Sequence, residues 1–114
     1  MIYICTESGF PSVRLDQMVT SAKRPELRDL ILVQRVRNVH HLLSVLSSDV
    51  ETVFDNNDDV SLVVIDSVAA VIRYDHELGG GIEKGGLIHK IGRYLLDLAF
   101  KHRVAVIAVN QVWF

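Results

Sequence analysis

Polar residues follow three apolar segments of the chain, at the point where each segment ends. They are Glu7, Asp66 with Ser67, and Asn110 with Gln111. If the segments are parallel strands, these side chains meet at one edge of a sheet, where ligands collect. An acid in that position is the usual way to anchor a magnesium ion beside nucleotide phosphates. A strand-ending aspartate is also a common helix cap or turn residue, so the spacing alone leaves both roles open for Asp66.

The segments around these residues alternate between strand-like and helix-like patterns. Apolar, β-rich runs predict strands at residues 2–6, 30–36, 62–66 and 104–109, and the first of them has the little polar interruption expected of a strand buried on both faces of a parallel sheet. Apolar residues at helical spacing predict helices at residues 11–22, between Asn38 and Phe54, and at residues 87–99. Strands that alternate with helices predict an α/β fold with a mainly parallel sheet.

Glycines crowd residues 79–86, with Lys84 among them. Because glycine loses the most backbone entropy on ordering, we expect a loop here that no helix or strand crosses. The segment differs from the phosphate-binding pattern G-x-x-x-x-G-K-[ST], since its glycines are spaced differently and no hydroxyl residue follows Lys84. No other segment of the chain fits that pattern.

The composition is that of an ordinary globular domain. The 114 residues are 49% hydrophobic and 23% charged, and no apolar stretch approaches the roughly 20 residues of a membrane-spanning helix. A net charge of -2 means that any contact with nucleic acid must be local. The single cysteine, Cys5, excludes an internal disulfide, and the five histidines do not have the spacing of a zinc site.

Three blocks of sequence resemble, in order and spacing, the eukaryotic RecA-family recombinases of DNA repair. Their residues are most similar to those of the recombinase paralogues. The blocks are YICTE at residues 3–7 with Phe10-Pro11 and Arg14-Leu15, LVVIDSVAA at residues 62–70 with Arg73, and VAV at residues 104–106 with Asn110-Gln111-Val112. Each block alone would match many nucleotide-binding proteins, whereas the three together are specific. The likeness spans essentially the whole chain.

The resemblance implies an incomplete RecA-like P-loop NTPase core, in which helices flank a mainly parallel sheet. Residues 1–114 would run from the strand after the P-loop to the start of the second DNA-binding loop, without the P-loop strand or the C-terminal strands. An isolated chain of this kind would expose apolar sheet edges that are normally paired, so we expect it to aggregate.

The resemblance also implies roles for the acids at the strand ends. Asp66 matches the Walker B acid, which holds magnesium through water, with Ser67 beside it. Glu7 matches the acid that orients or deprotonates the attacking water. Where the family has Gly-Thr-Phe after this glutamate, this chain has Ser8-Gly9-Phe10. A solvated strand-end glutamate, in a paralogue that binds nucleotide without efficient turnover, is therefore the alternative for Glu7.

The remaining site residues are matched in the same way. Gln111 matches the residue that senses the terminal phosphate, with Asn110 supporting it, and a plain polar strand end is the alternative. Arg73 and Lys84 belong with residues 74–86 to the place of the first DNA-binding loop, which grips single-stranded DNA. Three acidic residues in that segment oppose strong DNA binding, so the alternative is a surface loop that does not contact DNA.

The function implied by the resemblance is ATP-dependent DNA repair by homologous recombination in the nucleus, with ATP and Mg²⁺ as cofactors. The implied partners are single-stranded or branched DNA and other recombinase paralogues. The alternative is a non-catalytic RecA-like scaffold that binds those paralogues. This chain alone is expected to be inactive, since Asp66 supplies only part of a magnesium shell without the backbone amides of a P-loop. A phosphoacceptor receiver domain is disfavoured, because the first strand is followed by Glu7 alone rather than by an acidic pair.

Overall fold

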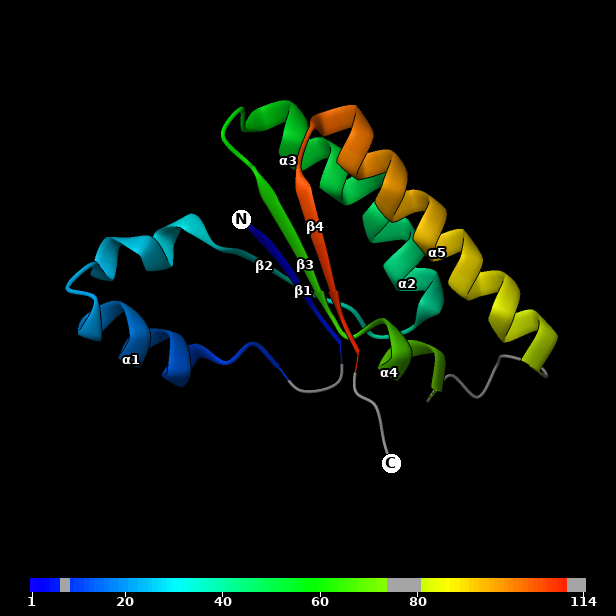
Figure 1. Ribbon diagram of the computed structural model, residues 1–114, viewed down its shortest axis with the longest axis horizontal. Helices are drawn as coiled ribbons and strands as arrows, with labels where there is room; N and C mark the ends of the chain where they lie inside the picture. The colour runs from blue at the N-terminus through cyan, green and yellow to red at the C-terminus, as the bar shows by residue number, and fades with distance from the viewer. Residues whose placement is uncertain (7–8, 74–80, 111–114) are drawn as a thin grey trace.

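The computed structural model describes residues 1–6, 9–73 and 81–110, and in these ranges four strands form one sheet (Figure 1). The strands are β1 (Ile2–Cys5), β2 (Leu32–Arg35), β3 (Leu62–Asp66) and β4 (Ala105–Val109). Their order in the sheet is β2-β1-β3-β4, and every neighbouring pair is parallel. The predicted α/β fold with a parallel sheet is therefore confirmed.

The register of the sheet brings the ends of three strands level with one another. Cys5 of β1 pairs with Asp66 of β3, and Asp66 pairs with Val109 of β4. The chain therefore leaves β1, β3 and β4 at the same edge, where Ser67 and Asn110 follow directly.

Three helical segments and one long helix cover one face of this sheet (Figure 1). They are α2 (Val39–Ser44), the π-helical η2 (Val45–Asp49), α3 (Val50–Asn56) and α5 (Gly81–His102). The helix predicted after Asn38 is thus present as α2, η2 and α3 in succession. Its start is capped, since the Asn38 side chain accepts a hydrogen bond of 2.8 Å from the backbone N–H of His41.

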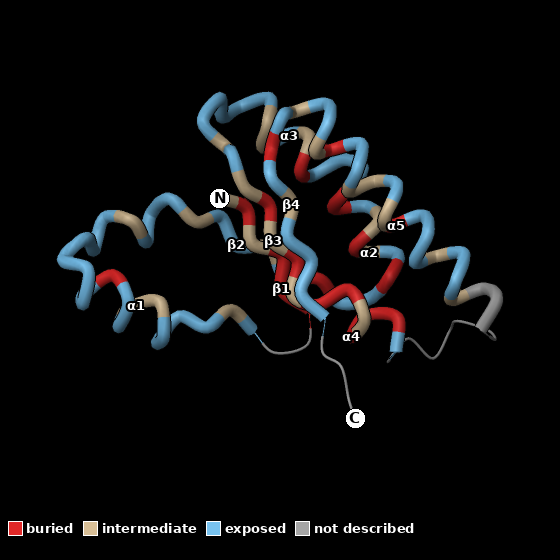
Figure 2. Tube along the Cα trace, in the orientation of Figure 1, coloured by how far each residue is buried: buried red, intermediate tan, exposed pale blue. Residues whose placement is uncertain are grey.

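The core lies between these helices and the face of the sheet that they cover (Figure 2). Ile4 and Ile65 are fully buried in the two central strands, and Leu42 is fully buried on α2. Each buried side chain of this size contributes about 1.5–3 kcal/mol relative to an exposed one. Alternation along the strands determines which residues take part, because successive side chains point to opposite faces.

The other face of the sheet is largely uncovered in the described part of the chain. Val33 of β2 is 46% exposed and Ile107 of β4 is 48% exposed. The strand predicted at residues 104–109 is present as β4, and most of it is exposed because it is an edge strand with described helices on one face only. Parallel sheets are usually covered on both faces. The expected aggregation of the isolated chain stays a prediction.

The segment between β1 and β2 stands away from the sheet. It holds α1 (Ser12–Ser21), which begins after Pro11 as predicted, and the 3₁₀ helix η1 (Pro25–Leu30), which was not predicted from the sequence. The two pack against each other through an ion pair of 2.8 Å between Asp16 and Arg28. Most of α1 is exposed, and Val13 is 71% exposed.

The long helix α5 begins at Gly81, inside the glycine-rich segment, so the predicted loop over residues 79–86 is wrong from Gly81 onward. Each glycine disfavours a helix by about 1 kcal/mol relative to alanine. The helix nevertheless extends to Gly81, since Ile91 and Leu98 anchor it on the core and each further residue adds a backbone hydrogen bond. Residues 74–80 lie outside the described ranges. No described helix has the length and apolar character that a membrane span requires.

One further helix, α4 (Val68–Arg73), follows β3 directly and was not predicted. It has only six residues, and a helix that is buried on most sides shows no alternation of apolar and polar residues at helical spacing. The buried residues are Val68, Ala70, Val71 and Ile72. The structure places α4 at the edge of the sheet where β1, β3 and β4 end (Figure 1).

Candidate functional site

The predicted site residues that the structure describes at the ends of the strands are Asp66, Ser67 and Asn110. All three lie at one edge of the sheet, as their positions after apolar segments predicted. Glu7 and Gln111, the other two residues of this set, lie outside the described ranges.

Thr6, whose role no pattern in the sequence indicates, organises the backbone at this edge. Its backbone N–H donates to the carbonyl oxygen of Asp66 at 2.9 Å. Its hydroxyl accepts from the N–H of Ser67 at 2.8 Å, and lies 3.2 Å and 3.0 Å from the carbonyl oxygens of Asp66 and Ser67. The Asp66-Ser67 peptide bond that it contacts is cis. Buried polar groups need such partners, and Thr6 and Ser67 are only 8% and 6% exposed.

The side chain of Asp66 is half-buried and is held by Tyr3. The Tyr3 hydroxyl donates to Oδ2 of Asp66 at 2.9 Å. Burial raises the pKa of Tyr3 to about 12, and the hydrogen bond to Asp66 and the negative charge of Asp66 add to the effect. The phenol therefore stays protonated near neutral pH and remains a donor to the carboxylate.

Tyr3 is in turn supported by Phe10. The two ring centroids are 5.0 Å apart and the ring planes meet at 75°, an edge-to-face arrangement. Such pairs favour a fixed geometry, because the positive edge of one ring meets the negative face of the other. In the sequence, Tyr3 and Phe10 are recognisable only as parts of a family motif. A tyrosine within an otherwise apolar strand was the available signal, since a buried phenol usually finds a polar partner.

Ser67 and Asn110 both bind the first turn of α4. The Ser67 hydroxyl accepts from the N–H of Ala70 at 3.2 Å, and Oδ1 of Asn110 accepts from the N–H of Ala69 at 3.1 Å. The first N–H groups of a helix have no partner inside the helix, so these contacts satisfy two of them. Asn110 thereby joins the end of β4 to the start of α4.

The two basic residues predicted to contact DNA lie on helices. Arg73 is the last residue of α4 and is exposed. Lys84 lies in the first turns of α5 and is half-buried, so it is not part of a loop as predicted. The reason is the extension of α5 through the glycine-rich segment. Arg73 and Lys84 thus flank residues 74–80 on either side.

The donor set at the site suits magnesium better than a metal held by several side chains. Within the described ranges, no group of three or more His, Cys, Asp or Glu side chains could hold a metal ion together. Asp66 supplies one carboxylate. Magnesium is usually held by one or two carboxylates together with waters and phosphate oxygens, so this residue set fits the ion.

A second polar cluster lies on the helices and was not predicted. Oε2 of Glu51 lies 3.1 Å from Nζ of Lys101 and 2.8 Å from Nε2 of His102. The His102 ring stacks on Phe54, with centroids 4.0 Å apart and ring planes at 4°. The cluster joins α3 to the end of α5, just before β4 begins, and so lies away from the site.

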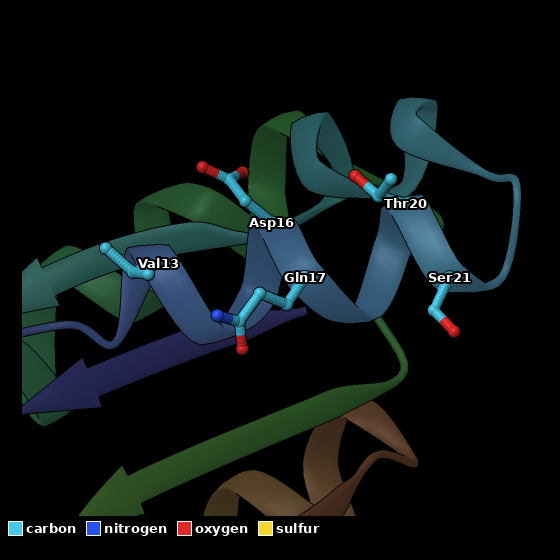
Figure 3. A pocket seen from close by; sticks show the side chains of 5 residues that line it. All are labelled: Val13, Asp16, Gln17, Thr20 and Ser21. Carbon is cyan, nitrogen blue, oxygen red and sulfur yellow. The ribbon is translucent and has the colours of Figure 1, made fainter.

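A hollow of about 540 Å³ borders α1 and is also separate from the site. Figure 3 shows the side chains that line it, which come from α1 alone and point in different directions around the helix. They are Val13, Asp16, Gln17, Thr20 and Ser21. Because these side chains do not converge, the hollow is a feature of the exposed helix surface and not a candidate binding site.

Comparisons with known proteins place the chain in a family. The Rad51 family profile matches residues 1–114. DNA repair protein XRCC3 of Mus musculus is 30% identical over 126 residues, which cover 97% of this chain and 35% of that protein. DNA repair and recombination protein RadB of Thermococcus kodakarensis is 33% identical over 120 residues, covering 98% of this chain and 49% of RadB.

DNA repair protein rhp57 of Schizosaccharomyces pombe is 27% identical over 135 residues, covering 97% of this chain and 37% of rhp57. The chain thus spans between 35% and 49% of the length of these three relatives. The family profile matches the whole chain, the relatives are similar in sequence, and the sheet is parallel and flanked by helices. These findings confirm the resemblance to RecA-family recombinases: the chain belongs to the Rad51 family.

Proposed function

We propose that this chain is part of a DNA-repair protein that acts in homologous recombination and uses Mg²⁺ and ATP at the edge where β1, β3 and β4 end. The observation that carries the proposal is the placement of Asp66. Its carboxylate lies at the end of a central strand and accepts a hydrogen bond from Tyr3, while Thr6 holds the backbone behind it. Membership of the Rad51 family and the relatives' names as DNA repair proteins support the role in recombination.

Each residue at the edge has a proposed part in this function. Asp66 would hold a magnesium ion through water, and the ion would neutralise phosphate charge. Ser67 and Asn110 hold the first turn of α4 beside it. For Glu7 and Gln111 we propose the family roles of orienting the attacking water and sensing the terminal phosphate.

Binding to DNA is proposed for the surface around Arg73 and Lys84, the last residue of α4 and a residue near the start of α5. Cations at these positions attract phosphates without reading sequence. The proposed ligand is single-stranded or branched DNA, the proposed partners are other recombinase paralogues, and the proposed location is the nucleus. ATP binding is proposed for the whole protein, because these 114 residues contain no G-x-x-x-x-G-K-[ST] segment.

Magnesium-dependent binding of a fluorescent ATP analogue to the full-length protein tests the proposal. We expect Asp66→Asn to weaken binding in the presence of magnesium and to leave binding in EDTA unchanged. Asp97→Asn is the matched control, because Asp97 is an exposed acid on α5. Equal binding by wild type and Asp66→Asn at every magnesium concentration would contradict the assignment of Asp66.

The alternative function is a non-catalytic scaffold that binds other paralogues. It is favoured by Ser8-Gly9-Phe10, which replaces the Gly-Thr-Phe of the family next to Glu7. The ATP turnover of the full-length protein with and without Glu7→Gln separates the two functions. A large loss of turnover on substitution supports hydrolysis, whereas an unchanged rate removes Glu7 from the chemistry and leaves the scaffold.

A further inference from the structure

We propose that Tyr3 is a positioning residue, which holds the carboxylate of Asp66 in one orientation for water-mediated contact with magnesium. The proposal rests on the proposed nucleotide site and adds a residue to it. Two observations carry it. The first is the hydrogen bond from the Tyr3 hydroxyl to Oδ2 of Asp66, and the second is the packing of Phe10 on the Tyr3 ring.

The sheet register explains why Tyr3 can reach Asp66. Tyr3 pairs with Val64, which lies two residues before Asp66 on the neighbouring strand. Two residues advance a strand by about 6.6 Å, a span that a tyrosine side chain can bridge. Tyr3, Val64 and Asp66 share one face of the sheet, because side chains alternate and the intervening Ile65 points to the buried face. A shorter polar residue at position 3 would not span this distance.

The hydrogen bond restricts a torsion that is otherwise loose. Rotation of an aspartate carboxylate about its last bond has a broad preference, so an unsupported Asp66 would present its oxygens in many orientations. The contact from Tyr3 engages Oδ2. Among the described residues, no side chain or backbone N–H donates to Oδ1. Oδ1 is thus the oxygen available to accept from a metal-bound water.

Phe10 holds the other end of the same side chain. Its ring meets the Tyr3 ring edge to face, so Tyr3 is fixed at the ring by Phe10 and at the hydroxyl by Asp66. Phe10 lies three residues after Glu7 in the chain. The ring contact between Phe10 and Tyr3 and the hydrogen bond between Tyr3 and Asp66 therefore connect the segment after β1 to the end of β3. Partners of metal-binding groups orient those groups, and losing such a partner commonly weakens metal binding by about 10-fold or more.

Tyr3→Phe tests the proposal, since it removes the hydroxyl and keeps the ring that packs on Phe10. The matched control is Tyr94→Phe on α5, where no hydrogen bond of the hydroxyl is found among the described residues. In the full-length protein, the magnesium concentration for half-maximal binding of a fluorescent ATP analogue is measured for each variant. We expect it to rise about 10-fold for Tyr3→Phe and to stay at the wild-type value for Tyr94→Phe.

Two further measurements separate positioning from a merely structural effect. Binding of the analogue in EDTA should be the same for Tyr3→Phe and wild type, because the hydroxyl acts only through Asp66. In an Asp66→Asn background, adding Tyr3→Phe should cause little further change, since coupled residues are not additive. The comparison between the double mutant and Asp66→Asn still tests the coupling of Tyr3 to Asp66 if Tyr3→Phe alone lowers the yield of folded protein.

Three results would overturn the inference. If Tyr3→Phe has the magnesium requirement of wild type while Asp66→Asn does not, Tyr3 is not a positioning residue and the proposed function stands. If Tyr3→Phe weakens binding equally with magnesium and with EDTA, the hydroxyl has a structural role only. If wild type itself binds the analogue without any dependence on magnesium, the magnesium site and this inference fail together.

Discussion

The Thr6 hydroxyl accepts a hydrogen bond of 2.8 Å from the backbone N–H of Ser67, which lies 61 residues further along the chain. Both residues are buried. The contact joins the end of β1 to the turn between β3 and α4, and so fixes the backbone next to Asp66.

Replacing Thr6 with valine keeps the shape of the side chain and removes this hydroxyl. The N–H of Ser67 would then be buried without its partner, so we expect the free energy of unfolding to fall by about 1–3 kcal/mol. Urea unfolding of the full-length protein measures the change. Thr20→Val is the control, because Thr20 is exposed on α1 and surface changes are usually within about 0.5 kcal/mol (Figure 3). Equal stability of the two variants would show that the Thr6 hydroxyl adds nothing.

Replacing Asn110 with alanine removes the side-chain oxygen that accepts from the N–H of Ala69. Loss of an acceptor at a helix start usually costs about 1 kcal/mol. We expect a larger effect on function, since α4 leads from this contact to Arg73. Nucleotide-stimulated binding of single-stranded DNA should decrease, while binding without nucleotide stays near the wild-type value. Fluorescence anisotropy measures both.

Asn110→Asp is the matched variant for that experiment, because it keeps an acceptor oxygen at the same position. It should retain more of the nucleotide stimulation than Asn110→Ala. If both variants respond to nucleotide as wild type does, the link between β4 and α4 has no part in DNA binding.

Replacing Gly85 with alanine tests the start of α5. A Cβ atom at this position meets no other atom within 4 Å, so the added methyl group causes no clash. Alanine favours a helix over glycine by about 0.8–1.0 kcal/mol, and we expect a gain of that size in the free energy of unfolding. Gly9→Ala is the control outside any helix, where the new Cβ would meet Nη1 of Arg35 at an ordinary 3.7 Å. A destabilised Gly85→Ala variant would contradict a helix at this position.

The Glu51 cluster predicts a dependence of stability on pH. Burial acts to raise the pKa of Glu51, but the hydrogen bonds and positive charges of Lys101 and His102 together outweigh it and lower the pKa below the usual 4.5. A lowered pKa in the folded state means that the stabilisation is complete above about pH 4.5 and is lost as the pH falls through the folded-state value.

Unfolding in urea at a series of pH values, with wild type and Glu51→Gln, measures this contribution. The difference between the two should be present at about pH 5 and should shrink as the pH falls below about 4.5. Since Lys101 is largely exposed, we expect a difference below about 1 kcal/mol. Glu26→Gln, at an exposed pair with Arg24, is the control and should show a smaller difference. A difference that grows as the pH falls would contradict the sign.

Local patterns were sufficient for most of the elements. The apolar runs that became β1 and β3, and the helix start at Pro11, were predicted within about a residue, the uncertainty normal for element ends. These patterns work because side-chain periodicity and proline geometry act over a few neighbouring residues. The start of α5 was missed, since glycine content argued for a loop while contacts of Ile91 and Leu98 with the core stabilised a helix.

The candidate site divides in the same way. The sequence by itself determined that Asp66, Ser67 and Asn110 share an edge, because parallel strands end at a common edge whatever the details of their packing. Only the tertiary structure decided that Tyr3 donates to Asp66 and that Thr6 accepts from Ser67. Those contacts join residues 63 and 61 positions apart, and they depend on the strand order and register of the sheet, which no local pattern contains.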